Sequence, residues 1–441
     1  MFKIESFLSA RLFLQPQLVD DHIYFLSNLS GHISLYRMDY GGSVPEPLLP
    51  PDIALQNPHF IDGFSFFVFP NLGKIIVMID QDGDENYQPK FIPIQGGFPE
   101  SLFSDNFSSY RVHLGHCDLE KNICYFSAES RHEQINETYL ANLNSETVHK
   151  IGESPWGLYP DAANKEHSKV ILIDSYTTGD HVLYLWQADK GSYRNIYGTP
   201  MNERGVDHKI VLNGIQDTHF TDEDRRLLFI TTLFEDTGGL GSLSLSTDCD
   251  VRPVNISGTI HTGLGELIGL KHIRENRYIL NFNIDGCSWV YEAEFDDPGL
   301  SMNVTRTICG QKPVASGVLE SIYFEKKSES YSLTFSSATS PTQIFTVEKG
   351  VHPGVIQHTN ERILGIDEAL LSPGEDASFI SFDGRQISAR LYMPSEELGY
   401  KYPRPLVYYI HGGPQSQERP DFAWFSMPLI QFLALSGFSV F

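Results

Sequence analysis

Residues 22–39 read HIYFLSNLSGHISLYRMD and carry the pattern on which the fold prediction rests. A short apolar stretch is followed by a polar turn that contains a glycine, and then by a second stretch in which apolar and polar residues alternate. A two-residue period with many β-branched and aromatic residues is typical of half-buried sheet strands. The segment therefore predicts two strands joined by a turn.

Six further segments repeat this pattern. They begin at Lys74, Ile123, Lys169, Arg226, Arg277 and Ser321. The spacing of about 44 to 57 residues is that of β-propeller blades, in which four strands make one blade and the ring leaves only short edges. No 3.6-residue period is sustained here, which argues against helical repeats. We therefore expect residues 1–365 to form a β-propeller of about seven blades. A β-sandwich array is the alternative, but the near-constant spacing favours the propeller.

Residues 366–441 have a different character. ASFISFDGRQISARLYMP, which begins at Ala377, predicts a β-hairpin, and its Asp383-Gly384 dipeptide suits a type I′ turn. The run from Leu406 to Ile410 has the length and composition of a strand buried on both faces. It leads into His411-Gly412-Gly413-Pro414.

A helix and a further strand are expected after this glycine-rich turn. Pro428 suits the first helical position and Gly437 the position just past the helix end. Leu429, Phe432 and Leu433 share one face and are expected to pack on the sheet. Another apolar strand begins at Phe438.

The order of hairpin, strand, glycine-rich turn, helix and strand is that of the start of an α/β-hydrolase domain. In that fold, a turn between the third strand and the first helix supplies a backbone N–H to the oxyanion hole. Two glycines let the backbone approach a developing oxyanion closely, because no Cβ intervenes. The expected fold is therefore mainly β, with a propeller followed by the incomplete start of an α/β-hydrolase domain over residues 366–441.

These motifs together resemble the prolyl oligopeptidase family of serine peptidases. The resemblance rests on the propeller, on FISFDGRQISARLYMP, on PLVYYIHGGP and on FLALSGFSVF. The HGGP form is similar to that of the acylaminoacyl-peptidase and bacterial dipeptidyl-peptidase branches. The resemblance implies a cytosolic or secreted peptidase for short peptides, with a propeller that restricts entry to the active site.

The resemblance also implies roles for the residues of the turn. The backbone N–H of Gly413 is expected to be an oxyanion donor beside Gly412, and His411 and Pro414 are expected to shape the loop. His411 is not expected to be the general base, because the catalytic histidine of the family lies far downstream.

The chain departs from the family in its catalytic residues. The Ser, Asp and His of this fold follow the glycine-rich turn, but the chain contains no G-x-S-x-G motif. We therefore expect the N-terminal part of a longer serine peptidase, inactive by itself. The alternative is a catalytically dead propeller that serves as a binding module, and an esterase or another hydrolase is a third possibility.

The composition limits the classes of binding partner that we expect. Lys and Arg number 32 and Asp and Glu 56, which gives a net charge of −24 at pH 7. An acidic surface repels phosphate backbones and anionic membranes, so we expect short peptide substrates, no nucleic acid and no membrane. The N-terminus lacks the apolar region of a signal peptide, and five cysteines in such a chain indicate reduced thiols and a cytoplasmic location. A disulfide between Cys117 and Cys124, across a turn, is the alternative.

No cofactor or metal is expected. Asp80, Asp82 and Asp84 resemble a calcium loop, but the glycine is fourth rather than sixth and Phe91 occupies the twelfth position. His113, His116 and Cys117 have ligand-like spacing, yet strand alternation puts the two imidazoles on opposite faces. Acidic residues near the propeller mouth could instead meet the free amine of a peptide.

Overall fold

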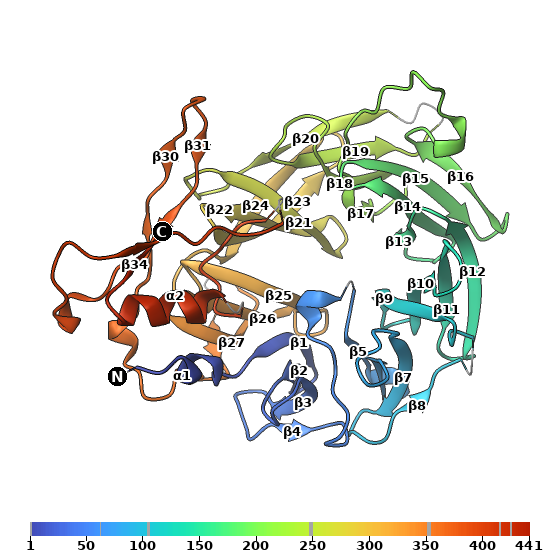
Figure 1. Cartoon of the computed structure of the whole chain (residues 1–441). Helices are drawn as coiled ribbons and strands as arrows, with labels where there is room; N and C mark the ends of the chain where they lie inside the picture. Colours follow the sequence, from blue (N-terminus) through green and yellow to red (C-terminus); the bar gives the residue numbers. More distant parts are fainter. Residues whose placement is uncertain are drawn as a thin grey trace.

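The computed structural model describes residues 2–61, 63–103, 106–246, 250–350, 354–413, 416–423 and 426–441. Within these ranges, seven antiparallel four-stranded units follow one another along the chain. The units are arranged around a central axis, with their first strands nearest to it (Figure 1). This is the arrangement of a β-propeller, and its seven units agree with the seven repeats predicted from the sequence.

Each unit contributes four strands in chain order. The inner strands are β1 (Phe13–Val19), β5 (Phe66–Phe69), β9 (Tyr110–Asp118), β13 (Leu158–Ala163), β17 (Gln216–Phe220), β21 (Gly265–Arg274) and β25 (Gly317–Glu325). The second strands are β2 (His22–Ser27), β6 (Lys74–Ile79), β10 (Ile123–Ser130), β14 (Lys169–Thr177), β18 (Arg226–Thr231), β22 (Arg277–Ile284) and β26 (Ser330–Ser337). The third strands are β3 (Ser34–Asp39), β7 (Gln88–Pro93), β11 (Asn136–Asn142), β15 (Asp180–Gln187), β19 (Gly239–Ser244), β23 (Cys287–Asp296) and β27 (Ser340–Val347). The outer strands are β4 (Glu46–Pro47), β8 (Glu100–Ser101), β12 (Thr147–Ser154), β16 (Ser192–Tyr197), β20 (Val251–Ser257), β24 (Ser301–Cys309) and β28 (Val355–Gln357).

The repeats found in the sequence coincide closely with these strands. The first six begin at the first residues of β2, β6, β10, β14, β18 and β22. The seventh was placed at Ser321, which lies inside the inner strand β25. The inner strand β25 and the second strand β26 resemble each other in apolar content, so the pattern alone did not distinguish them.

The core of the ring lies between neighbouring units. In β6, the four residues from Ile75 to Met78 are all buried, because the sheet packs against a neighbour on each face. Ile76 belongs to the cluster shared with the third unit, whereas Ile75 and Val77 belong to the cluster shared with the first. The second strands therefore appear in the sequence as almost continuous apolar runs.

The fifth and sixth units are joined at their rims. β20 pairs with β24 in parallel, with Asn255 opposite Ser301, and the two units form one eight-stranded sheet. The other units in the described ranges form separate four-stranded sheets.

Side chains close the ring, because the first and last units share no strand. The Ser332 hydroxyl of β26 donates to the Pro16 carbonyl (2.9 Å) and accepts from the Leu18 N–H (3.2 Å). The Thr342 hydroxyl accepts from the Phe13 N–H at 2.8 Å. All three contacts are buried, so the backbone of β1 is held by hydroxyls of the last unit.

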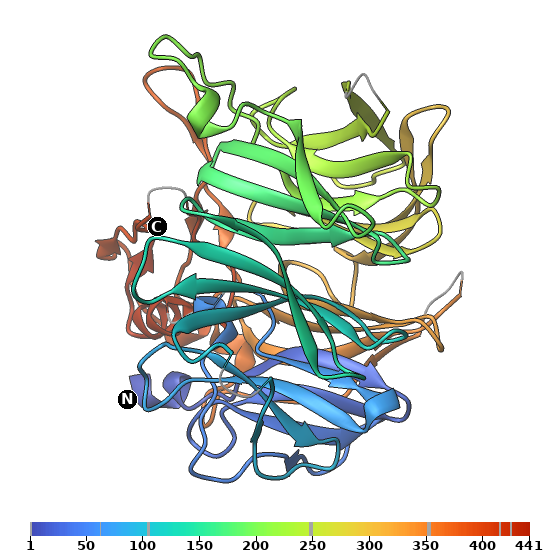
Figure 2. The same cartoon turned by 90° about the vertical axis from the view of Figure 1, so that its right-hand side faces the viewer.

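The remaining elements form a smaller C-terminal unit on one face of the ring (Figure 2). It contains β29 (Glu375–Asp376), β30 (Phe379–Ile380), β31 (Gln386–Ile387), β32 (Arg390–Leu391), β33 (Leu406–Val407), α2 (Ser426–Leu435) and β34 (Ser439–Val440). Short 3₁₀ turns are η1 (Pro58–Phe60), η2 (Pro70–Leu72), η3 (Met201–Glu203), η4 (Glu368–Leu370) and η5 (Glu396–Leu398).

The N-terminal helix α1 (Ile4–Leu8) packs into this C-terminal unit. Its buried Phe7 stacks on Phe422, with ring centroids 6.4 Å apart, and shares a core with Met427 and Ile430 of α2. Neither α1 nor α2 has the length and hydropathy that crossing a bilayer requires, and the same holds for every helix in the described ranges.

The predicted hairpin is present, but its turn type was wrong. β30 and β31 pair antiparallel, with Phe379 opposite Ile387. Gly384 has a φ of 83°, whereas Asp383 does not have a positive φ. A type I′ turn needs positive φ at both central residues. The connection instead uses glycine alone, with the Gly384 N–H donating to the Ser381 carbonyl at 2.9 Å.

Replacing Ser332 with alanine is expected to weaken the closure of the ring. The substitution leaves the Pro16 carbonyl and the Leu18 N–H buried without their partner, so the free energy of unfolding should fall by about 1 to 3 kcal/mol. The matched control is Ser330→Ala on the same strand, whose hydroxyl only reaches Ser328 of its own turn at 3.4 Å. Urea unfolding measures both variants, and equal losses would contradict the proposed closure.

Candidate functional site

The glycine-rich loop leaves the C-terminal sheet at β33. The Tyr409 N–H donates to the Phe441 carbonyl at 2.8 Å, and His411, Gly412 and Gly413 then follow as exposed residues. Gly413 has a φ of 142°, which lies within the range that favours glycine. Pro414 lies outside the described residues. The structure therefore brings three of the four predicted loop residues together at one exposed corner.

The strand before the loop was predicted to be longer and more buried than it is. Only Leu406–Val407 forms β33, and Leu406, Tyr408 and Ile410 are 46%, 66% and 82% exposed. β33 pairs with β34, with Leu406 opposite Ser439. Val407 and Tyr409 pack against the C-terminal core, whereas the alternating residues on the opposite face are exposed, so the core covers only one face of the segment.

The helix after the loop is present, but it begins at Ser426, so Pro428 is its third residue and not its first, and its orientation was predicted only in part. α2 contains Pro428 in its first turn, and Gly437 follows its end with a φ of 94°. Leu429 is 40% exposed, so its predicted burial was wrong, whereas Phe432 and Leu433 pack against the C-terminal core. The residues of α2 that are buried are Ser426, Met427, Pro428, Ile430, Gln431, Ala434 and Leu435.

A buried amide explains this orientation of α2. Gln431 is fully buried, and its side chain accepts from the Ser372 N–H (2.9 Å) and donates to the Ser372 carbonyl (2.7 Å) and the Ala338 carbonyl (2.8 Å). Ala338 belongs to the last propeller unit, so Gln431 turns its own face of the helix toward the ring. The helix face predicted from the sequence was purely apolar and did not include this buried polar contact.

The loop offers hydrogen-bond donors but no catalytic pair. Within the described ranges, the N–H groups of Gly412 and Gly413 donate no hydrogen bond, and a Cβ added at Gly412 would meet no atom within 4 Å. His411 places its Nδ1 2.9 Å from the Gly412 carbonyl. Unpaired backbone N–H groups of this kind can stabilise a developing negative charge. No nucleophile stands beside them in the part of the chain that the structure describes.

Glu418 connects the loop to α2. Its carboxylate accepts a hydrogen bond from the hydroxyl of Ser426, the first residue of α2. Burial raises the pKa of Glu418, and the Ser426 bond and the nearby His411 partly offset this rise. The bond therefore helps to fix where the helix begins relative to the loop.

The segment after the loop is docked on the propeller by the polar side chains of Gln417 and Arg419. The Asn283 amide donates to Gln417 Oε1 at 2.8 Å. Arg419 donates from Nε to the Gly286 carbonyl and from Nη2 to the Ser288 hydroxyl, each at 3.0 Å. Sequence analysis did not single out these residues, because residues 415–419 are all polar and give no local signal that distinguishes the docking side chains.

The inner strands are tied to one another by charged side chains that face the central axis. The Thr218 N–H donates to Asp161 Oδ2 (2.6 Å), and the Leu270 N–H donates to Asp217 Oδ2 (2.9 Å). Burial raises the pKa of Asp217 to about 6. Each carboxyl group thus holds the inner strand of the next unit in place.

Lys271 continues this pattern with the opposite charge. Its Nζ donates to the Ile322 carbonyl of β25 at 3.0 Å. Burial lowers the pKa of Lys271 to about 8. The charged side chains of Asp161, Asp217 and Lys271 therefore serve contacts between neighbouring units.

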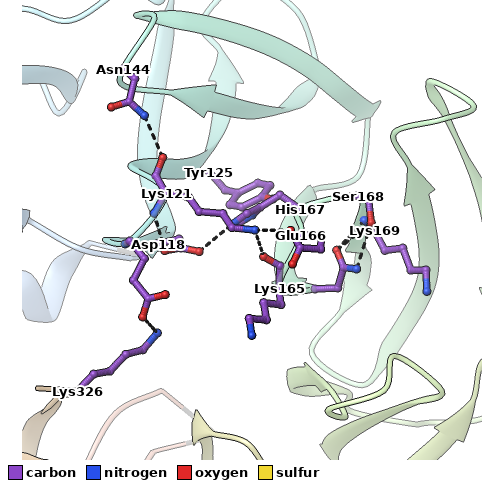
Figure 3. Close-up of polar contacts among 12 residues, drawn as sticks. Asp118, Lys121, Tyr125, Asn144, Lys165, Glu166, His167, Ser168, Lys169 and Lys326 are labelled. Carbon is purple, nitrogen blue, oxygen red and sulfur yellow. Dashed lines mark hydrogen bonds and ion pairs between the residues drawn. The ribbon is translucent and has the colours of Figure 1, made fainter. Parts of the chain in front are cut away.

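A network of polar contacts crosses the end of the ring away from the C-terminal unit (Figure 3). Lys326 forms an ion pair with Glu120 at 3.1 Å, which connects the last unit to the third. His167 contacts Asp118 Oδ2 (2.9 Å) and the Tyr125 hydroxyl (2.8 Å). Turns of the third, fourth and seventh units are thus joined by side chains at this opening.

The remaining sequence candidates have structural roles in the described residues. Asp80 and Asp84 accept hydrogen bonds from N–H groups of their own turn, at 3.2 and 2.9 Å. Cys117 and Cys124 lie opposite each other on β9 and β10, as expected, and both thiols are free. The described residues contain no group of three or more His, Cys, Asp or Glu arranged to hold a metal ion.

Solved structures share this fold. A prolyl endopeptidase matches with a TM-score of 0.70 at 12% identity, over 99% of this chain and 62% of its own. Prolyl oligopeptidase B from Galerina marginata, bound to a 35-residue hydrolysis and macrocyclization substrate, matches at 0.68 and 14%, over 99% and 63%. A puromycin hydrolase matches at 0.70 and 13%, over 100% and 68%.

These likenesses show the fold and not the activity. The chain spans about 62% of the length of the prolyl endopeptidase that it matches. No family model matches the chain, and no curated protein matches its sequence.

Replacing Gly437 with alanine is expected to disturb the end of α2. A Cβ there would lie 2.9 Å from the Tyr400 ring, in addition to the strain of a φ of 94°. The matched control is Gly399→Ala, where φ is 70° but no atom lies within 4 Å of the added Cβ. The control should cost about 1 to 2 kcal/mol of strain.

The Gly437→Ala variant should lose more stability than this control, and hydrogen exchange should accelerate in α2 and β34. Urea unfolding and hydrogen-exchange mass spectrometry measure the two effects. Equal losses in the two variants would show that the Tyr400 contact has no influence.

Proposed function

We propose that the chain is the N-terminal part of a serine peptidase of the prolyl oligopeptidase family, which hydrolyses short peptides through an acyl-enzyme. The observation that carries this proposal is the exposed loop His411–Gly413, set between a parallel strand pair and a helix on one face of a seven-unit ring. Solved prolyl peptidases with the same fold support it. Their greater length is consistent with catalytic residues beyond those of this chain.

In this proposal, the loop supplies the electrostatic part of the reaction. The Gly413 N–H, beside Gly412, donates to the oxyanion of the tetrahedral intermediate, and His411 and Pro414 shape the loop. Among the described residues, the N–H groups of Gly412 and Gly413 have no acceptor and the space at Gly412 is open, which supports this role. The nucleophile, the general base and its orienting carboxylate come from elsewhere in the complete enzyme.

The separate core of the C-terminal unit supports the proposed division into domains. Residues 1–365 form the propeller domain, and residues 366–441 begin the α/β-hydrolase domain. The core that contains Tyr392, Met427 and Val440 supports a separate C-terminal unit, to which α1 also belongs through Phe7. The HGGP form of the loop favours the acylaminoacyl-peptidase and dipeptidyl-peptidase branches.

We also assign to the propeller the control of substrate access. The ion pair between Lys326 and Glu120 crosses the opening opposite the C-terminal unit, and the hydroxyls of Ser332 and Thr342 hold the first unit to the last. In this proposal, these contacts keep the ring closed, so that folded proteins do not enter it. Short or unfolded peptides remain as substrates, in a cytoplasmic enzyme that binds neither nucleic acid nor membranes.

A catalytically dead propeller remains the second candidate. The absence of G-x-S-x-G from the chain favours it. Under this hypothesis, the free N–H groups of the loop serve no reaction, and the ring acts as a binding platform.

The 441-residue chain is expected to be inactive, because it contains no serine on a nucleophile elbow. A fluorophosphonate probe and a chromogenic peptide test this directly. We expect no labelling and no turnover, while a known serine peptidase reacts under the same conditions. Ser439→Ala is the matched control, because Ser439 lies in a near miss to the elbow, Gly437-Phe-Ser-Val-Phe, which lacks only the closing glycine. Labelling that this variant abolishes would overturn the prediction.

The coding sequence beyond Phe441 separates the two candidates. A reading frame that continues into G-x-S-x-G, with later Asp and His residues, and whose product reacts with the probe, would support the peptidase. A stop codon after Phe441 would exclude the peptidase and favour the binding propeller.

A further inference from the structure

Two carboxyl groups meet on one serine where the C-terminal segment docks on the propeller. The Ser336 hydroxyl lies 3.1 Å from Glu320 Oε1 and 3.0 Å from Asp421 Oδ1. It also accepts from the Phe422 N–H at 3.2 Å. Ser336 is only 1% exposed, and Glu320 belongs to the inner strand β25 of the same unit. The contact therefore joins the last propeller unit to segment 416–423.

The number of protons in this contact can be counted. A serine hydroxyl has one hydrogen and can donate to only one acceptor at a time. Asp421 Oδ1 already accepts from the Ala423 N–H at 2.7 Å. If both carboxyls were ionised, Ser336 could satisfy only one of them, and the other would place two acceptors 3 Å apart in a buried site. A proton on one carboxyl, donated to the Ser336 oxygen while the Ser336 hydroxyl donates to the other carboxyl, removes this clash of acceptors.

The charges around the pair determine how firmly this proton is held. His59 of η1 places its Nε2 3.1 Å from Glu320 Oε2. Arg419 lies on the same segment as Asp421 and interacts with both carboxyls, and with Glu266 of β21 and Cys287 of β23. Burial, followed by the charge of Glu320, raises the pKa of Asp421. Hydrogen bonds from the Ala423 N–H and the Ser336 hydroxyl only partly offset this rise in the pKa of Asp421.

We propose that Glu320 and Asp421 share a single proton through Ser336, and that this proton holds segment 416–423 on the propeller. Gln417 and Arg419 dock the same segment, which begins three residues after Gly413. Glu320 and Asp421 are therefore positioning residues, which set the glycine loop relative to the ring. The shared proton stands independently of the proposed peptidase, whereas its effect on an oxyanion hole rests on that proposed function.

The direction of the pH dependence follows from the raised affinity for the proton. Segment 416–423 is fully docked when the pH lies below the pKa of a free carboxyl. Its docking weakens as the pH rises through the pKa of the docked pair. Above that pH, two negative charges face each other in a buried site. The segment should then separate from the propeller while the seven units stay folded.

Hydrogen-exchange mass spectrometry on the 441-residue chain tests this proposal without requiring catalysis. The readout is the protection factor of peptides that cover residues 416–423, which is the intrinsic exchange rate divided by the observed rate. It is measured at each pH from 4.5 to 9. In the wild type, protection should fall about tenfold per pH unit once the shared proton begins to dissociate. Peptides from β26 serve as the internal reference for the folded ring.

Glu320→Gln is the decisive variant, because an amide can donate permanently to Ser336. Its protection should be high and independent of pH. Glu325→Gln on the same strand is the matched control, since Glu325 only accepts hydrogen bonds from its own turn, at Lys327 and Ser328. This control should behave as the wild type. If Glu320→Gln does not fold by circular dichroism, Asp421→Asn provides the same test from the other partner.

Two results would overturn the proposal. One is protection of the wild-type segment that does not change with pH. The other is a Glu320→Gln variant whose protection is low at every pH, which would show that Glu320 acts as a permanent anion for Arg419. Either result leaves the proposed peptidase function untouched, because the probe-labelling experiment measures that separately.

Discussion

The closure of the ring by side chains is the interaction on which the rest of the structure depends. A ring of separate sheets has no continuous ladder of backbone hydrogen bonds around it, so other groups must hold neighbouring units together. Ser332 and Thr342 provide these groups between the last and first units, and Asp161 and Asp217 provide them farther along the inner wall. In each case a buried side chain pairs with a backbone group of the next unit. An unmade bond of this kind is costly, which gives the units a defined relative position.

Much of the fold follows from local sequence patterns, and the exceptions have physical causes. Strand periodicity located the second strand of six units, because those strands are buried on both faces and appear as apolar runs. It failed at Ser321, where an inner strand has the same pattern. The periodicity also overestimated the burial of Leu406 and Ile410. A sequence pattern shows which residues are apolar, but it does not show how many other elements pack against a strand.

Some residues of the candidate site could likewise be predicted from the sequence, and others could not. His411, Gly412 and Gly413 were identified from composition and order alone. Glycine allows backbone conformations that other residues rarely adopt, and this property does not depend on distant contacts. Gln417, Arg419 and Asp421 were not identified, since their partners lie from 85 to 134 positions earlier in the chain. No local rule relates Asp421 to Ser336. Such long-range polar docking becomes visible only when the fold brings the two segments together.

The packing of α1 into the C-terminal core has a consequence for the order of assembly during synthesis. α1 spans only Ile4–Leu8, and a helix of this length is not stable in water without a partner. Its partners Met427 and Ile430 are made about 420 residues later, so Phe7 must wait roughly 20 to 80 seconds at 5 to 20 residues per second. The inner strand β1 waits almost as long for the hydroxyls of Ser332 and Thr342. A ribosome-bound chain therefore carries an N-terminal segment whose Phe7 remains available to chaperones until α2 has left the ribosome.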